Sequence, residues 1–235
     1  MAKSIDRLES LLDALLVELL RELGFTQAER LIFQREIPEV KHLLRFPTRL
    51  QSGIMHFNAN AAIRFERIET LLGDNDPLSP TLMMPIHLLR PNKKYIEWEF
   101  RPESPGDLAD RVTGDCQQYL IPFFQKLGTI ERLKTQLLYE IDHFAEVAGL
   151  RAKMSSDYEP TKFRVALQND DKLRLVLSPQ QRVEKLAAIY VLEGKRDEAE
   201  QLINRELAKL SEAKQLPPRI SQRLRLERLK KTLLT

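Results

Sequence analysis

The sequence predicts an α+β fold: an antiparallel sheet of about four to five strands, covered by helices on one face and followed by a mainly helical C-terminal region. Three observations support this prediction. A leucine-rich helical pattern opens the chain, period-two alternation follows it, and a helical pattern returns after Ser178. We therefore divide the chain into an α+β domain at residues 1–140, a connecting segment at 141–177, and a helical hairpin with a basic C-terminal helix at 178–235.

The first helix is predicted at residues 4–24. Its leucines recur at spacings of three and four, which places them on one side of a helix. Gly24 is expected to end the helix, because glycine readily adopts the left-handed conformation that closes a helix C-terminus. The apolar side of this helix needs a cover, and a sheet is the simplest one.

The next region has the alternation that is typical of strands. A short strand is predicted to begin at 31–33, and a second strand at 41–46. Residues 53–65 place apolar side chains at every second position, so they are predicted to form one long, half-buried antiparallel strand. A short helical turn is predicted at 66–72.

A pair of strands is predicted at residues 84–90 and 95–100, joined by a turn that begins at Pro91. The second strand alternates strictly along its length. Its two faces consist of Tyr95, Glu97 and Glu99 on one side and Ile96, Trp98 and Phe100 on the other. The pattern predicts a core-forming strand with a polar outer face.

Helices are predicted again from residue 107 onward. A helix at 107–127 has an apolar side, and Pro122 is expected to bend or end it. A short helix is predicted at 129–139. Residues 163–167 and 173–177 fit either strands or short helical pieces, with a helix favoured for the first of them.

The C-terminal region begins with a helix-start signal, since Ser178 suits an N-cap and Pro179 the first helical position. The pattern that follows is helix, turn at Gly194, helix, and residues 181–210 resemble one helical hairpin of the tetratricopeptide kind. Because such repeats need stacked neighbours and no second copy is present, the hairpin is expected to pack on the body of the protein. A basic helix follows Pro217.

The charge is distributed unevenly. The 235 residues carry a net charge of +3, but residues 214–235 carry +6, so the rest of the chain is mildly acidic. A basic amphipathic helix of this kind fits binding to nucleic acid or to an acidic partner, but the pattern favours packing of its leucines on the hairpin with its charges in water. An anionic membrane surface is a third fit. The candidate binding residues are Arg219, Arg223, Arg225, Arg228, Lys230 and Lys231.

Catalytic signatures are missing from the sequence. The single cysteine, Cys116, lies on a helix side with apolar neighbours, and the four histidines are scattered. No glycine-rich phosphate loop occurs, so no cofactor and no metal site are predicted, and the chain is not expected to be an enzyme. Glu97 and Glu99 share one strand face and would suit a metal-dependent hydrolase, but the alternation favours a solvated, partner-facing strand.

The sequence also predicts where the protein works. A lone cysteine rules out an internal disulfide framework and suits a reducing compartment. No run of about 18 apolar residues occurs, so no transmembrane segment is expected. We therefore predict a cytoplasmic protein of bacterial type.

Residues 18–138 resemble a known bacterial family, domain of unknown function 4304. The resemblance depends on the order and spacing of several segments. They are LGF at 23–25, LIFQRE at 31–36, the strand at 55–65, the strand ending at Arg90, Trp98, and IPFFQKL at 121–127. The resemblance implies an antiparallel sheet with helices on one face, and it implies no catalytic residues because the family has no established reaction. It does not extend to the hairpin and basic helix after Ser178.

The leading hypothesis for function is a non-catalytic protein-interaction module. A role as an immunity or defence-accessory protein in bacterial conflict is an analogy that fits this module. The first alternative is a nucleic-acid-binding protein that acts through residues 214–235. The second alternative is a metal-dependent hydrolase that uses Glu97 and Glu99.

Overall fold

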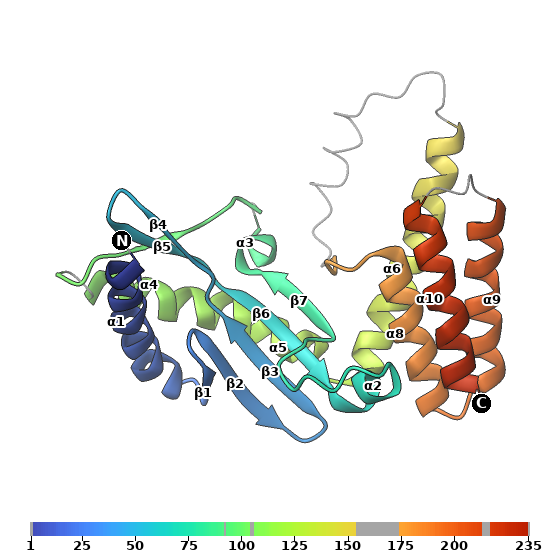
Figure 1. The fold of residues 1–235 in the computed structure, drawn as a ribbon, viewed down its shortest axis with the longest axis horizontal. Helices are drawn as coiled ribbons and strands as arrows, with labels where there is room; N and C mark the ends of the chain where they lie inside the picture. The colour runs from blue at the N-terminus through green and yellow to red at the C-terminus, as the bar shows by residue number, and fades with distance from the viewer. Residues whose placement is uncertain (1, 92, 104–105, 154–173, 213–216, 235) are drawn as a thin grey trace. The chain divides into compact units, whose positions relative to one another are not determined.

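The computed structural model of the chain (Figure 1) describes residues 2–91, 93–103, 106–153, 174–212 and 217–234. It has two compact units. We call Met1–Arg64 with Leu82–Gly128 the sheet unit, and Phe65–Thr81 with Thr129–Thr235 the helical unit. The predicted α+β class is confirmed, with antiparallel strands and C-terminal helices.

The sheet unit contains two sheets rather than one. The five-stranded sheet has the order β1 (Thr26–Glu29), β2 (Ile32–Ile37), β3 (Val40–Arg45), β6 (Asn60–Phe65) and β7 (Leu82–Pro85). The three-stranded sheet has the order β4 (Thr48–Gln51), β5 (Ile54–Phe57) and β8 (Trp98–Phe100). The predicted strands at 31–33 and 41–46 correspond to β2 and β3, which pair in antiparallel register.

The long strand predicted at 53–65 is divided in two. β5 pairs with β4 in the small sheet, whereas β6 pairs with β7 in the large one, and the break falls at Asn58 and Ala59. A turn at Ser52 and Gly53 joins β4 to β5, and both residues have positive φ, as a type I′ hairpin turn requires. The alternation of side chains continues through the break, which is why the sequence pattern did not reveal it.

The prediction that strands at 84–90 and 95–100 pair with each other is wrong. β7 ends at Pro85, and the chain turns into the short helix α3 (Ile86–Leu89) instead of continuing as a strand. β8 does not pair with β7; it pairs with β5, where Trp98 lies opposite Phe57. Proline has no N–H for a ladder hydrogen bond, so it suits the end of a strand and the start of a helical turn.

Helices cover one face of the sheets. They are α1 (Ala2–Arg21), α4 (Gly106–Asp115), the π-helical turn η1 (Cys116–Leu120) and α5 (Ile121–Leu127). The helix predicted at 107–127 therefore continues past Pro122. Because Pro122 cannot donate a backbone hydrogen bond, the turn before it opens to i→i+5 bonding, as the bond from Ile121 N to Cys116 O shows.

The core of the sheet unit contains a row of aromatic rings that spans both sheets. The centroid distances are 5.8 Å for Phe33–Phe46, 6.3 Å for Phe46–Phe57 and 5.3 Å for Phe57–Trp98. The leucines of α1 that point inward, such as Leu16, are fully buried. Burial of these large side chains contributes most of the stability of such a core.

A buried histidine lies between β3 and α5. His42 is 3% exposed, and its ring stacks on Phe124 at a centroid distance of 4.3 Å. Nη2 of Arg35 lies 3.1 Å from Nδ1 of His42. Because a guanidinium only donates, Nδ1 accepts this bond and the ring is neutral. Burial, and secondarily the charge of Arg35, lowers the pKa of His42 to about 4.

We expect the folded protein to lose stability as the pH falls from about 6.5 to about 4, because protonation of His42 is favoured in the unfolded chain, where its pKa is near 6.5. The contribution is present above pH 6.5 and amounts to about 3 kcal/mol when it is fully lost. Urea unfolding at several pH values measures it. The variant His42→Leu should show a flatter pH dependence in this range, and an equal slope in both proteins would contradict the assignment.

The helical unit is made of five described helices. They are α2 (Glu66–Leu71), α6 (Ile130–Lys153), α8 (Pro179–Leu192), α9 (Arg196–Glu212) and α10 (Pro217–Leu234). The predicted helical turn at 66–72 is α2, and the short helix predicted at 129–139 is the first part of the longer α6. The boundary predicted at residue 140 therefore lies inside a helix. The segment predicted at 163–167 is outside the described residues.

The predicted helix signals of the hairpin are confirmed. Ser178 forms a capping box with Gln181, and Pro179 occupies the first turn of α8. Gly194 has a φ of 75° in the turn between α8 and α9. No described helix is both long and apolar enough to cross a membrane.

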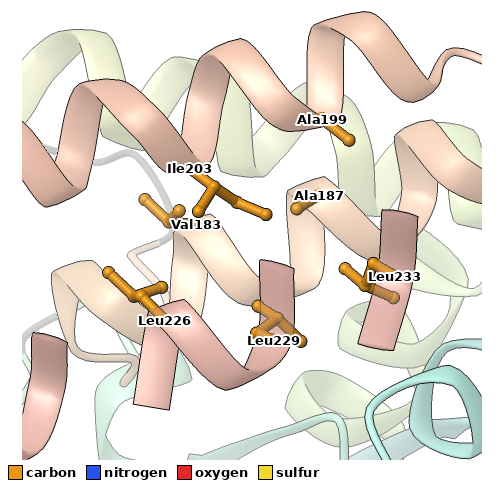
Figure 2. Close-up of a cluster of buried hydrophobic side chains, with 7 residues drawn as sticks. All are labelled: Val183, Ala187, Ala199, Ile203, Leu226, Leu229 and Leu233. Atoms are coloured by element: carbon orange, nitrogen blue, oxygen red, sulfur yellow. The ribbon is translucent and has the colours of Figure 1, made fainter. Parts of the chain in front are cut away.

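The basic helix α10 packs on the hairpin. Figure 2 shows seven buried side chains gathered between three helices, which are Val183 and Ala187 of α8, Ala199 and Ile203 of α9, and Leu226, Leu229 and Leu233 of α10. The third helix supplies the cover that a lone helical hairpin lacks.

Three buried charged side chains of α8 form ion pairs with three other helices of this unit. Arg182, Glu184 and Lys185 of α8 are between 2% and 8% exposed. Each pairs with a different helix, and the pairs are Arg182–Glu140 to α6, Glu184–Arg225 to α10 and Lys185–Glu69 to α2. Helix α8 is therefore surrounded by other helices rather than lying at the surface.

Candidate functional site

The three-stranded sheet brings the predicted residues Glu97 and Glu99 close to Arg49 and His56. Arg49 of β4 lies opposite His56 of β5, and His56 lies opposite Glu99 of β8. Residues directly opposite one another point to the same side of a sheet, and Glu97 shares the side of Glu99 because side chains alternate. We call Arg49, His56, Tyr95, Glu97 and Glu99 the strand face.

Glu97 is the centre of the strand face. Nε of Arg49 donates to its Oε1 at 2.9 Å, and Nη2 of Arg49 donates to Oε2. The hydroxyl of Tyr95 donates to Oε1 at 2.6 Å, and Nδ1 of His56 lies 3.9 Å from Oε2. The hydrogen bond from Arg49, followed by that from Tyr95, lowers the pKa of Glu97 to about 2. The carboxylate therefore stays ionised and cannot act as a general acid near neutral pH.

Glu99 has its own cation, because Nη2 of Arg101 donates to it at 2.9 Å and lowers its pKa. A magnesium ion held by Glu97 and Glu99 would have to displace an arginine from each carboxylate. Within the described parts of the chain, no three His, Cys, Asp or Glu side chains gather as metal ligands. The geometry does not favour the metal-dependent hydrolase.

Two large side chains of the strand face are exposed in defined positions. Tyr95 is 58% exposed and the side chain of Arg49 is 52% exposed. Besides its bond to Glu97, the Tyr95 hydroxyl accepts a hydrogen bond from Nδ2 of Asn58 at 3.3 Å, and the ring lies 5.3 Å from that of His87. The opposite side of β8 is anchored by Trp98, which is 2% exposed. The exposed groups are thus held on a rigid support.

Sequence reasoning identified Glu97 and Glu99 but missed Arg49 as their neighbour. The hairpin turn at Ser52 and Gly53 would have indicated that Arg49 faces His56 across β4 and β5. The position of β8 beside β5 has no such local signal, because about 40 residues separate them in the chain.

The second candidate surface is the basic helix. Three of its predicted cations pair with carboxylates of the same unit, and these pairs are Arg223–Glu227, Arg225–Glu184 and Lys230–Glu200, at 2.8, 2.8 and 2.7 Å. Arg228 is exposed and forms no ion pair with the rest of the described chain. Lys231 lines a hollow on this helix, and Arg219 lies in its first turn, where only the backbone is described.

Cys116 is fully buried in η1. Burial, and secondarily the charge of Asp115, raises the pKa of its thiol to about 12. The thiol stays protonated, so its environment is that of a core side chain and not of a nucleophile.

Comparison of the chain with protein-family models, with curated proteins and with solved structures found no match. The geometry of the two surfaces is therefore the basis for a functional proposal.

Proposed function

We propose that the protein is a non-catalytic protein-interaction module that binds its partner through the strand face. The observation that carries the proposal is the exposed pair of Arg49 and Tyr95, both held in place by Glu97. Tyrosine and arginine are enriched among the residues that dominate interface energies. Because these two side chains are already ordered, binding costs less conformational entropy.

The position of the network supports binding over chemistry. Glu97 is ionised, so it has no proton to give, and it already accepts hydrogen bonds from Arg49 and Tyr95, which leaves it little capacity to hold a metal. We extend the proposal, as an analogy, to a role as an immunity or defence-accessory protein in bacterial conflict.

The nucleic-acid alternative is less favoured. Several cations of α10 form ion pairs with carboxylates of the same unit, and Leu226, Leu229 and Leu233 of the helix are buried against the hairpin. A helix used in this way for packing presents a weaker positive surface than its sequence suggests.

The proposal is tested by a photo-crosslinking residue, benzoylphenylalanine, placed at position 95 and expressed in the source organism. We expect a single protein adduct from this position, because Tyr95 is 58% exposed on the strand face. The variant Arg49→Glu should reduce retention of the same protein by about 30-fold in a pull-down, which corresponds to the loss of one interface hot spot of about 2 kcal/mol.

The control is the same crosslinker at Lys126, which is exposed in α5 of the same unit but lies outside the strand face. It should give no such adduct. The proposal fails if positions 95 and 126 give the same adducts, or if Arg49→Glu retains the partner as well as the wild type does.

A further inference from the structure

A hollow of about 630 Å³ lies along α10 in the helical unit. Leu224, Arg228 and Lys231 line it at successive helical turns, and Leu234 lies at its end. The opposite wall includes Glu200 of α9. From Leu224 to Leu234 the hollow has a length of about 15 Å, which matches about three turns of a helix.

The apolar part of the hollow is open to solvent. Leu224 is 49% exposed, and Ile220, one turn earlier on the same side, is 45% exposed. These two side chains differ from Leu226, Leu229 and Leu233, which the same helix buries against the hairpin. Helix α10 thus has a second apolar side that the described residues leave uncovered.

The charges of the hollow favour an acidic ligand. Its two carboxylates are engaged, since Glu227 pairs with Arg223 and Glu200 pairs with Lys230. Arg228 has no carboxylate partner among the described residues and projects beside Leu224, one helical turn away. Arg228, which has no ion pair within the described residues, is therefore next to an exposed leucine.

This combination fits a peptide better than a nucleic acid. Two leucines line the hollow, and no aromatic side chain that could stack on a base lies among its lining residues. An amphipathic helix that docks in a groove offers both kinds of contact, apolar side chains for the leucines and a carboxylate for the arginine.

We propose that the hollow along α10 is a second binding site, which takes an acidic amphipathic helix of a partner protein. Apolar side chains of that helix contact Leu224 and Leu234, and one of its carboxylates pairs with Arg228. The site belongs to the helical unit and does not depend on the strand face, so either proposal can fail without the other.

Fluorescence anisotropy on the full chain tests this site with four labelled probes. The first is a peptide of about 18 residues with a leucine stripe flanked by glutamates, which is long enough as a helix to span the hollow. The second has lysines in place of the glutamates, the third is a scrambled form of the first, and the fourth is a short DNA duplex. We expect the acidic amphipathic peptide to bind at least about tenfold more tightly than the other three.

Matched variants assign the binding to the hollow. Arg228→Glu and Leu224→Asp should each weaken binding of the acidic peptide by about tenfold or more, whereas Arg228→Lys should stay within about threefold of the wild type. Arg205→Glu, which reverses an exposed charge on α9 outside the hollow, should leave binding unchanged. Circular dichroism confirms that each variant is folded, as expected for exposed positions.

Two results would overturn the proposal. One is equal binding of the acidic and scrambled peptides. The other is tighter binding of the DNA duplex, lost in Arg228→Glu and steeply weakened between about 50 and 200 mM salt, which would make α10 a nucleic-acid surface instead.

Discussion

Replacing Glu140 by alanine is expected to lower the free energy of unfolding of the helical unit by about 3–5 kcal/mol. Oε2 of Glu140 lies 2.6 Å from Nε of Arg182, and the two side chains are 3% and 4% exposed. The other oxygen accepts the backbone N–H of Leu175 at 2.6 Å, while Nη2 of Arg182 donates to Leu175 O at 3.0 Å. The Glu140 carboxylate thus pairs with a buried guanidinium and with a buried backbone N–H. Its removal leaves both groups buried without this partner, and the free energy spent on desolvating them is no longer offset.

Urea unfolding followed by hydrogen exchange in α6 and α8 measures this loss. Glu140→Gln should cost less than Glu140→Ala, because the amide oxygen can still accept a hydrogen bond while the charge is gone. The control is Glu131→Ala in the exposed first turn of α6, which should cost under about 1 kcal/mol. Similar losses for Glu140→Ala and Glu131→Ala would show that the buried pair is unimportant for the fold.

The pair of Lys185 and Glu69 is expected to behave differently when both residues are replaced. Nζ of Lys185 lies 2.6 and 2.8 Å from the two carboxylate oxygens, and the side chains are 10% and 2% exposed. Lys185→Met leaves the carboxylate of Glu69 buried without this partner and should cost about 3–5 kcal/mol. The double variant Glu69→Leu with Lys185→Met should return to within about 2 kcal/mol of the wild type, because hydrophobic side chains can replace a buried pair.

Thermal unfolding of the four proteins in this double-mutant cycle gives the coupling energy directly. Recovery in the double variant would indicate that the pair selects the position of α2 on α8 more than it adds stability. If the double variant is as unstable as the sum of the two single variants, the pair has no energetic coupling and this explanation is wrong.

Local signals in the sequence predicted the elements that begin or end at residues with a strong conformational preference, or that have a regular apolar spacing. Ser178 and Pro179 start α8, Gly194 separates the two helices of the hairpin, and the leucine spacing identifies α1. The predictions failed where the structure depends on which strand pairs with which. Residues 53–65 alternate without interruption, but β5 and β6 belong to different sheets. Periodicity reports which side of a strand is buried and carries no information about which strand lies beside it.

The same limit applies to the candidate sites. Alternation around Trp98 correctly placed Tyr95, Glu97 and Glu99 on one side of a strand, but only the pairing of β4 with β5 and of β5 with β8 brings Arg49 to Glu97. The sequence of α8 gave no hint that Arg182, Glu184 and Lys185 are buried, since charged residues on a helix ordinarily face water. Their burial depends on carboxylates and a guanidinium that other helices supply.

The sequence by itself determined the α+β class, the start of α8 at Ser178, the turn at Gly194 and the concentration of positive charge after residue 213, because each depends on residues close together in the chain. The tertiary structure decided which strands pair, which charges are buried and that α10 is packed on the hairpin through three leucines. These features depend on contacts between segments far apart in the chain, and the free energy of burying apolar surface and pairing charges selects among the arrangements that local pattern allows.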